Sequence, residues 1–558
     1  MKKNILFIIL FASFSAVISS CKKKDSTGLL IPDDAAMVVH FNAASLSSKL
    51  SWDNIKATNW FQKFQNENHD SLAQQFLADP ASNGIDLKSD LVYFLKMRST
   101  GAYIVVNGKL KNDSAFAAHC KKLIPDGTQS RDGSFSFITK DDNSAVIWNK
   151  ERFAFVANTP NMMWNRRYDN ESPAQDQKTV TADSLKNYGE KIINLSNTQT
   201  LGTDSRFASL INQPGDIHAW IDIGKIYSST NMTGQMMSMM KVSSLFEGNI
   251  YAMTLNFDNG KISLNGKNYQ GEEMSKIWKK YPPKRMDETL INRLPANDVM
   301  VAFVNNFKPE AIKDIFKTIG VDGLINLFLG KSNLSLDDII NANKGQMLFA
   351  LTGIDTKNAA KISGKLNTEE DKEPMNNIPR NNLVKFIFAN AINNKGDFDR
   401  LLDLLKGKEG MFENDLKDYT FRVKDDWFAA GDSANVAAFF SGHSNTVPYA
   451  DRISGHPFGA YIDFQKIISH LAGKNTDSSR AAALTTSKNM WQDMVMTGGD
   501  FTDGALNFSL DVNLVNKNIN SLKQLNSYLD QMAATYKNHL DIKRSMNNSL
   551  KIKTNPVE

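Results

Sequence analysis

Apolar and polar residues alternate in several short segments of the chain. The clearest is 506–514, where Leu, Phe and Val occupy every second position. A period of two predicts a β-strand with one dry and one solvated face, which is typical of an antiparallel sheet. Met37, Val39 and Phe41 alternate in the same way, so we expect these three side chains to form the buried face of a strand.

A helical period follows some of these strands. Leu522, Leu525, Leu529 and Met532 recur at the spacing of one helix face, which predicts an amphipathic helix able to cover the dry face of the preceding strand. Half-buried strands, tight hairpin turns such as Asn259-Gly260 and intervening helices predict an α+β fold with antiparallel sheets packed by helices.

The same order of segments occurs twice along the chain. Each match joins a strand-like or hairpin-like segment to its counterpart: 32–42 with 295–305, 103–116 with 385–398, 134–142 with 420–426, 214–226 with 457–467, and 251–262 with 496–506. In the helix after the second match, Phe116 and Cys120 stand where Phe398 and Leu402 stand in the later copy. This order predicts two related halves that arose by internal duplication.

The predicted organisation has six parts. They are a signal peptide (1–20), a lipidated tether (21–30), a first α+β half (31–283), a linker (284–293), a second α+β half (294–540) and a C-terminal tail (541–558). The prolines of Tyr281-Pro-Pro-Lys-Arg285 favour a stiff boundary before the linker. The charged stretch 357–380, interrupted by two prolines, predicts an exposed loop.

The N-terminal segment is typical of a targeting sequence. Lys2 and Lys3 precede an apolar stretch at 5–17, and Ser19-Ser20 lead directly to Cys21. Cysteine at this place resembles a bacterial lipobox, which implies that Cys21 is acylated and begins the mature protein. Several acyl chains on one cysteine give stable membrane attachment. By resemblance to sorted lipoproteins, Lys22 after the cysteine favours the outer membrane, facing either the periplasm or the exterior.

Charge and cysteine content narrow the possible partners. The formal charge of +5 includes Lys2 and Lys3, so the charge of the remaining chain is nearly balanced. The sequence has no arginine-rich stripe with interleaved aromatic residues, so it does not predict nucleic-acid binding. If Cys21 is acylated, Cys120 is the only other cysteine, and no intramolecular disulfide can form. Membrane attachment and an unknown envelope protein or ligand are therefore the expected partners.

Several polar residues have a structural interpretation as well as a chemical one. The residues that end predicted strands, Asn42, Asp222, Asn306 and Asp463, suit helix N-caps better than catalysis, and Pro309 suits a first helical turn. His40 and His218 lie on alternating strands and are expected to face solvent. Asp141-Asp142 and Asp425-Asp426 fit turns better than a calcium loop.

Three further motifs leave alternatives open. Gly330-Lys331-Ser332 resembles the end of a phosphate-binding loop, but position 325 is isoleucine where that loop needs glycine. Met232, Met236, Met237, Met239 and Met240 could bind copper(I) or an apolar ligand, or could fill gaps as a packed helix. Cys120 could be a reactive thiol, although its helix position favours a core residue.

The lipobox, the Ile31–Ala35 start with its Val38–Asn42 strand, the predicted helix at 45–50 and the total length resemble one known family. It is a family of uncharacterised Gram-negative lipoproteins, the domain-of-unknown-function family 4836. The resemblance implies a location in the cell envelope, but it implies no activity, substrate or catalytic residue.

These observations predict a lipid-anchored envelope protein that acts as a non-enzymatic binding or interaction module. Cys21 is the one predicted site, through lipidation; no catalytic residue, cofactor or metal site is expected. Two alternatives remain: an envelope hydrolase with a site assembled from distant residues, and a carrier of copper or an apolar ligand through Met232–Met240.

Overall fold

The computed structural model describes residues 25–67, 82–98, 101–160, 180–229, 242–354, 384–406, 419–442, 447–472 and 478–535. The predictions for the signal peptide, Cys21, the methionine segment, the 357–380 loop and the tail lie outside these residues. The chain divides into two compact units, unit 1 (Met1–Ala44 and Asp79–Ile221) and unit 2 (Ser45–Ala78 and Asp222–Glu558).

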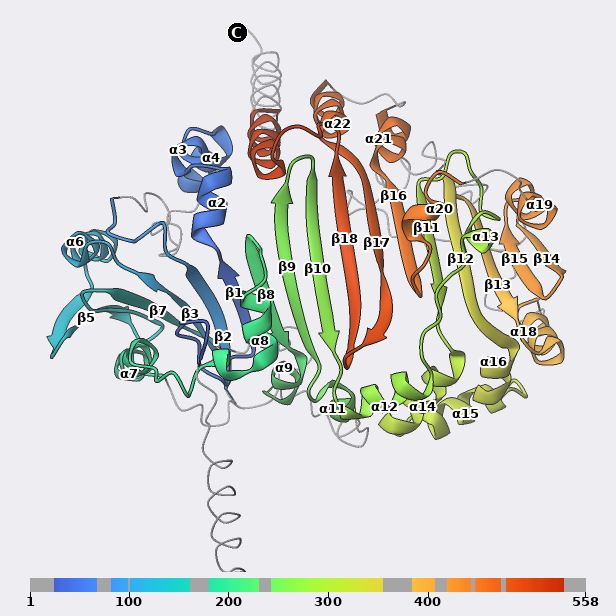
Figure 1. Ribbon diagram of the computed structural model, residues 1–558, viewed down its shortest axis with the longest axis horizontal. Helices are drawn as coiled ribbons and strands as arrows, with labels where there is room; N and C mark the ends of the chain where they lie inside the picture. The colour runs from blue at the N-terminus through green and yellow to red at the C-terminus, as the bar shows by residue number, and fades with distance from the viewer. Residues whose placement is uncertain are drawn as a thin grey trace, which may run out of the picture. The chain divides into compact units, whose positions relative to one another are not determined.

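The described part of unit 1 contains eight antiparallel strands, coloured blue to green in Figure 1. In spatial order they are β4 (Thr128–Asp132), β5 (Phe135–Asp141), β6 (Ser144–Trp148), β7 (Arg152–Pro160), β3 (Gly101–Lys109), β2 (Leu91–Arg98), β1 (Met37–Phe41) and β8 (Ile217–Asp222).

Helices cover both faces of this sheet. They are α6 (Asp113–Leu123), α7 (Ala182–Ile193), the short 3-10 helix η1 (Leu201–Thr203) and α8 (Ser205–Ile211). Phe116 of α6 packs on Trp148, with ring centroids 5.6 Å apart, whereas Gly189 of α7 lies against Ile147. Because Ile147 and Trp148 are consecutive in a strand, they point to opposite faces.

Ten antiparallel strands lie in the residues of unit 2 that the structure describes. In spatial order they are β9 (Ile250–Asp258), β10 (Lys261–Tyr269), β18 (Ala505–Leu514), β17 (Trp491–Thr502), β16 (Phe458–Asp463), β11 (Val301–Asn306), β12 (Asn343–Ile354), β13 (Val384–Ile392), β15 (Trp427–Gly431) and β14 (Thr420–Lys424).

Helices gather at both ends of the unit 2 strands (Figure 1). At one end lie α9 (Ile223–Ser229), α11 (Val242–Phe246), α12 (Glu272–Lys280), α14 (Pro309–Ile319), α15 (Asp322–Gly330) and α16 (Leu336–Ala342). Toward the other end lie α21 (Phe464–Ala472), α22 (Ser478–Met490) and the helix at 521–535. The remaining helices are α3 (Trp52–Lys56), α4 (Asn59–Glu67), α13 (Glu288–Ile291), α18 (Lys395–Lys406), α19 (Ser433–Ser441) and α20 (Ala450–Ile453); α2 (Ala43–Lys49) spans the division at Ala44.

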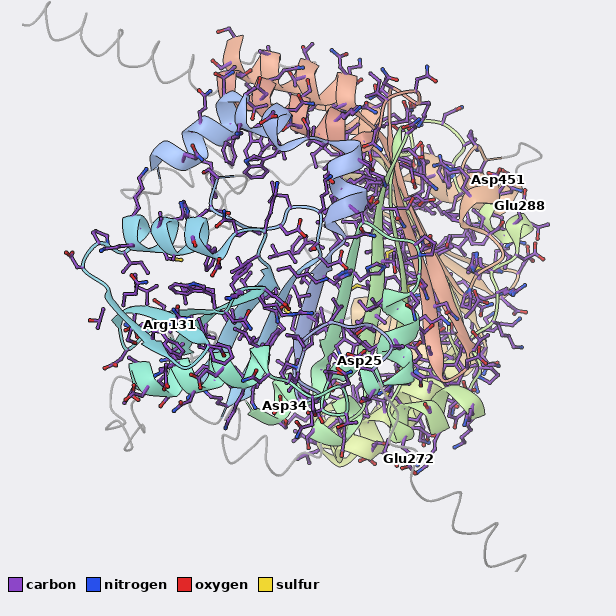
Figure 2. All side chains as sticks on the ribbon, turned by 60° about the vertical axis from the view of Figure 1, so that its left-hand side comes forward. Asp25, Asp34, Arg131, Glu272, Glu288 and Asp451 are labelled. Carbon is purple, nitrogen blue, oxygen red and sulfur yellow. The ribbon has the colours of Figure 1, made fainter. Side chains whose placement is uncertain are left out.

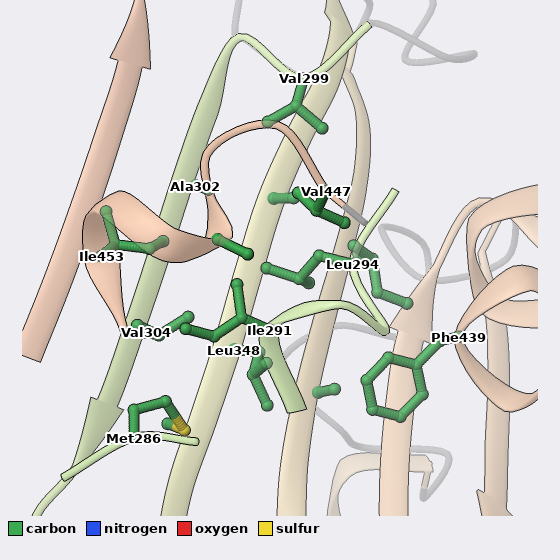
Figure 3. Packing of buried hydrophobic residues seen from close by; sticks show 14 of the residues in the cluster. Met286, Ile291, Leu294, Val299, Ala302, Val304, Leu348, Phe439, Val447 and Ile453 are labelled. Carbon is green, nitrogen blue, oxygen red and sulfur yellow. The ribbon is translucent and has the colours of Figure 1, made fainter. Parts of the chain in front are cut away.

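The main core of unit 2 lies between β11–β13 and the segments packed over them (Figure 3). Ile291 and Leu294 come from the chain that precedes β11, and both are fully buried beside Leu348 of β12. Met286 is buried in the same cluster. The 284–293 stretch, predicted as a linker, is therefore a packed part of unit 2. Acidic side chains such as Glu272, Glu288 and Asp451 lie at the margin of the molecule in Figure 2 and are exposed.

The fold class is confirmed as helices packed on antiparallel sheets. The buried face of β1 is not the predicted one, because Val38 and His40 are buried whereas Met37, Val39 and Phe41 are half-buried. Residues 506–514 form β18, but its interior positions are half-buried on both faces. The prediction of one dry and one wet face is therefore wrong for this strand, which lies between β10 and β17.

Two of the predicted helix caps are confirmed. The carboxylates of Asp222 and Asp463 accept hydrogen bonds from the backbone N–H groups of Lys225 and Lys466, and Pro309 opens α14. Asn306 does not cap α14, because that helix begins only at Pro309; its side-chain amide instead donates to the Arg285 carbonyl.

Candidate functional site

The most unusual polar group in unit 1 is a pair of buried histidines. His40 of β1 and His218 of β8 are directly opposite in the antiparallel register and are 3% and 1% exposed. Their Nδ1 atoms lie 3.0 Å apart and their rings stack. The expectation that both histidines face solvent is therefore wrong: β1 is an interior strand between β2 and β8, and the face that carries both rings is buried.

The outer ring nitrogens of the pair also have partners. Nε2 of His218 lies 3.0 Å from the carbonyl oxygen of Gln213, which can only accept, so this nitrogen carries a proton. Nε2 of His40 lies 3.3 Å from Oδ2 of Asp90, although the angle is poor for a hydrogen bond. A hydrogen bond between the two Nδ1 atoms then needs one proton, donated by His40 to neutral His218.

The electrostatics agree with this distribution of protons. Burial, followed by the nearby His40, lowers the pKa of His218 and favours its neutral form. Contact with His40 lowers the pKa of Asp90 despite partial burial, so its carboxylate stays ionised.

The pair can hold and relay a proton, but it is a poor metal site. Both Nε2 atoms already face other groups, which leaves two nitrogens to converge, whereas a structural zinc site needs four ligands. Across the described ranges, no group of three or more His, Cys, Asp or Glu side chains could hold a metal ion.

A second histidine–carboxylate pair lies in unit 2. Nδ1 of His456 is 2.6 Å from Oδ2 of Asp500, whose other oxygen lies 3.3 Å from Nε of Arg285. His456 is partly exposed, with 43% of its side chain accessible. A carboxylate on Nδ1 fixes the tautomer and leaves Nε2 as the basic nitrogen, which is the arrangement of a general base.

An apolar surface is the third candidate and lies on α15. Leu324, Leu327 and Phe328 are 57%, 71% and 74% exposed, and their i, i+3, i+4 spacing places them on one helix face. Lys331 extends this stripe by one turn, with Nζ 5.5 Å from the centre of the Phe328 ring. We call Leu324, Leu327 and Phe328 the α15 face.

The local sequence explains why this face points outward. Gly320, at φ +73°, ends α14 in a left-handed turn. After α15, Leu334 and Leu336 are buried, and the Asn326 side chain accepts a hydrogen bond from the Leu336 backbone N–H. These contacts hold one side of α15 against α14 and α16, so the opposite side carries the exposed residues.

The other predicted residues have structural roles where the structure describes them. Cys120 is fully buried on α6, and burial raises the pKa of its thiol to about 12, which makes a reactive thiol wrong for the folded protein. Asp425 and Asp426 form the β14–β15 turn with φ of +51° and +58°, which confirms turn chemistry. Gly330 ends α15, and Lys331-Ser332 follow in a turn.

The α15 face and the histidine pair could be predicted only in part from the sequence. The spacing of Leu324, Leu327 and Phe328 is visible in the sequence, but the same pattern is typical of a core-facing helix. The two histidines are 178 positions apart, and only strand register brings them together.

Comparisons with known proteins identify a family but no activity. A family model described as "Domain of unknown function (DUF4836)" matches residues 28–361. No curated protein matches the chain. Two similar solved structures are described as crystal forms I and III of TP0453. The form I structure has 9% sequence identity and a TM-score of 0.25, and the match covers 44% of this chain and 81% of that chain. The form III structure has 10% sequence identity and a TM-score of 0.26, and the match covers 46% of this chain and 87% of that chain.

Proposed function

Since the chain belongs to the DUF4836 family, whose description assigns no activity, we propose a function from its own residues. The protein is a lipid-anchored component of the cell envelope, attached at Cys21 in the outer membrane, and acts as a non-enzymatic binding or interaction module. The α15 face is the observation that carries this proposal. Large apolar side chains gathered on an exposed surface cost solvation free energy, and such patches typically mark binding sites.

The anchoring part rests on the sequence around Cys21. We expect metabolic labelling with an alkyne palmitate analogue to mark the wild-type protein in the membrane fraction and not Cys21→Ser. Cys120→Ala is the matched control and should be labelled like the wild type, because the Cys120 thiol is buried. Equal labelling of Cys21→Ser would contradict the anchor.

The binding part is tested by affinity capture of the lipidated protein from its own envelope. A reproducible bound component that is lost with Leu327→Asn/Phe328→Asn would support the α15 face as the binding surface. The same component captured equally by that variant would contradict it.

Hydrolysis is a second candidate, which the His456–Asp500 pair favours. If His456 acts as a general base, His456→Gln should abolish any ester or amide hydrolysis by the purified protein, whereas His470→Gln should not. Hydrolysis that persists in His456→Gln would eliminate this pair. A carrier function through Met232–Met240 stays a prediction.

We also infer that the two predicted halves arose by duplication. Strands β7–β3–β2–β1–β8 of unit 1 and β15–β13–β12–β11–β16 of unit 2 have the same spatial order. Single contacts also correspond: Phe116 packs on Phe153 with centroids 5.1 Å apart, and Phe398 packs on Phe428 at 5.3 Å. Superposition of 31–283 on 294–540 tests this proposal.

In this correspondence the histidine pair has no polar counterpart. His40 faces His218 across β1–β8. When the strands are aligned on their closing residues, Asn42 on Asn306 and Asp222 on Asp463, the matching pair across β11–β16 is Val304 and Gly459. The strand arrangement therefore does not itself require two histidines, which makes them a specific feature of the first half.

A further inference from the structure

The α15 face has a size that limits what can cover it. With about 200 Å² for each fully exposed large side chain, Leu324, Leu327 and Phe328 present on the order of 400 Å² of apolar surface. A stable protein interface buries about 800 Å² on each partner. The face alone is therefore too small for a stable folded partner, but it is large enough for side chains that insert into a lipid layer.

The surroundings of the face are electrically neutral. Residues 308–344 contain five lysines and five acidic residues. Several of these charges are already paired: Asp314 with Lys280, Lys313 with Asp337, and Asp338 with Arg400. Asp322, in the first turn, is the only charged residue within α15. A surface of this kind fits an uncharged apolar occupant and gives an acidic or basic partner little to recognise.

Lys331 stands at the border of the face in a way that suits a membrane surface. Its ammonium group lies 5.5 Å from the centre of the Phe328 ring, and Lys331 is exposed, so the charged group can turn to the solvated edge while the methylene chain covers apolar surface. Long cationic side chains take this arrangement where hydrocarbon meets lipid headgroups.

We propose that the α15 face is a second membrane contact, in which Leu324, Leu327 and Phe328 insert at the boundary between headgroups and acyl chains of the bilayer that anchors the protein. This rests on the proposed function, because the anchor at Cys21 keeps the chain beside a bilayer. An amphipathic helix in this position lies in the plane of the interface. A second contact restricts how the tethered protein is oriented on the membrane surface.

The test uses the predicted mature chain, residues 21–558, with Cys21→Ser, so that neither an acyl chain nor the apolar 5–17 segment contributes. Co-flotation is measured with vesicles of phosphatidylcholine, alone and mixed with phosphatidylglycerol. We expect binding to both with little dependence on salt, and a decrease in partition coefficient of about tenfold or more for Leu327→Asn/Phe328→Asn. Leu529→Asn, which alters an exposed leucine of the 521–535 helix, is the matched control and should bind unchanged.

A second measurement tests whether position 327 itself contacts the lipid. With Cys21→Ser and Cys120 buried, a thiol introduced by Leu327→Cys can be labelled selectively with an environment-sensitive dye. We expect a blue shift with phosphatidylcholine vesicles at position 327 and none for Asn489→Cys, an exposed position on α22 toward the other end of the unit 2 strands.

Three results would overturn the proposal: no flotation of the Cys21→Ser protein, equal flotation of Leu327→Asn/Phe328→Asn, or a dye shift at 327 that follows protein concentration without vesicles. The last result would assign the face to a second copy of the chain. Palmitate labelling separates this outcome from the anchor, because labelled wild-type protein keeps the proposed anchoring even if the α15 face does not bind lipid.

Discussion

At the scale of single residues, the histidine pair links the fold of unit 1 to pH. His218 stays neutral because its folded-state pKa is lowered, whereas the unfolded chain takes up a proton near the ordinary value of about 6.5. Between those two pKa values the unfolded state binds more protons, so stability is fully present above about pH 6.5 and decreases as pH falls. Asp90 adds a further loss at lower pH, because its pKa is also lowered.

We therefore expect the unfolding free energy of unit 1 to decrease as pH falls from 7.5 to 5.5, and to decrease less in His40→Val/His218→Ala. His218→Ala alone should cost about 1–3 kcal/mol at pH 7.5, because it leaves a buried His40 nitrogen without its partner. Urea denaturation followed by tryptophan fluorescence measures both effects. His470→Gln in unit 2 is the control; an unchanged pH slope in the double variant would contradict the assignment.

Cys120 gives a second prediction at this scale. Because its thiol is buried and its pKa is raised to about 12, we expect no alkylation of the folded protein at pH 8 and full alkylation in denaturant. Mass spectrometry of the Cys21→Ser chain counts the labelled thiol. Rapid labelling without denaturant would show that α6 opens or that the thiol is exposed.

At the scale of elements, a partly buried ion pair attaches α20 to β17. Both terminal guanidinium nitrogens of Arg452 donate to Asp493, at 2.6 and 3.0 Å, and the side-chain amide of Asn513 in β18 donates to the same carboxylate. These hydrogen bonds keep the pKa of Asp493 low although the side chain is only 10% exposed.

Arg452→Met should therefore destabilise unit 2 by about 2–4 kcal/mol, because it leaves a buried carboxylate without its cation. Chemical denaturation measures the loss. Lys276→Met is the matched control, since it removes a lysine whose ion pairs with Glu272 and Glu273 are exposed, and it should leave stability unchanged. Equal effects of the two substitutions would contradict the role of burial.

At the scale of the whole molecule, the predicted halves are not independent within unit 2. Strand β10 belongs to the first predicted half, yet it pairs along its whole length with β18 of the second. Removal of residues before 284 would expose the backbone N–H and C=O groups of β18 as a new sheet edge.

We expect a fragment of residues 284–558 to self-associate or to unfold at lower urea concentration than a fragment of 222–558, which retains β9 and β10. Size-exclusion chromatography and circular dichroism distinguish the two fragments. A monomeric 284–558 fragment as stable as the longer one would show that the second half folds without β10.

Much of the fold could be predicted from short-range sequence patterns. Alternation, turn pairs and caps depend on neighbouring residues, so the hairpins β9–β10 and β17–β18 and the caps at Asp222 and Asp463 were readable. Cys120 was readable as a core residue for the same reason, because it shares a helix face with Phe116. Membership of the DUF4836 family was also recognisable from residue patterns.

The candidate sites were decided only by the tertiary structure. Periodicity shows which side chains share a face of a helix or strand. Whether that face is covered depends on segments that are distant in the sequence. The register of β1 and β8 brings His40 and His218 together on a buried face, and the α15 face is exposed because α14 and α16 cover only the opposite side. Local residue patterns are enough to predict the elements and the fold class, whereas long-range strand register and packing control which faces are exposed to solvent.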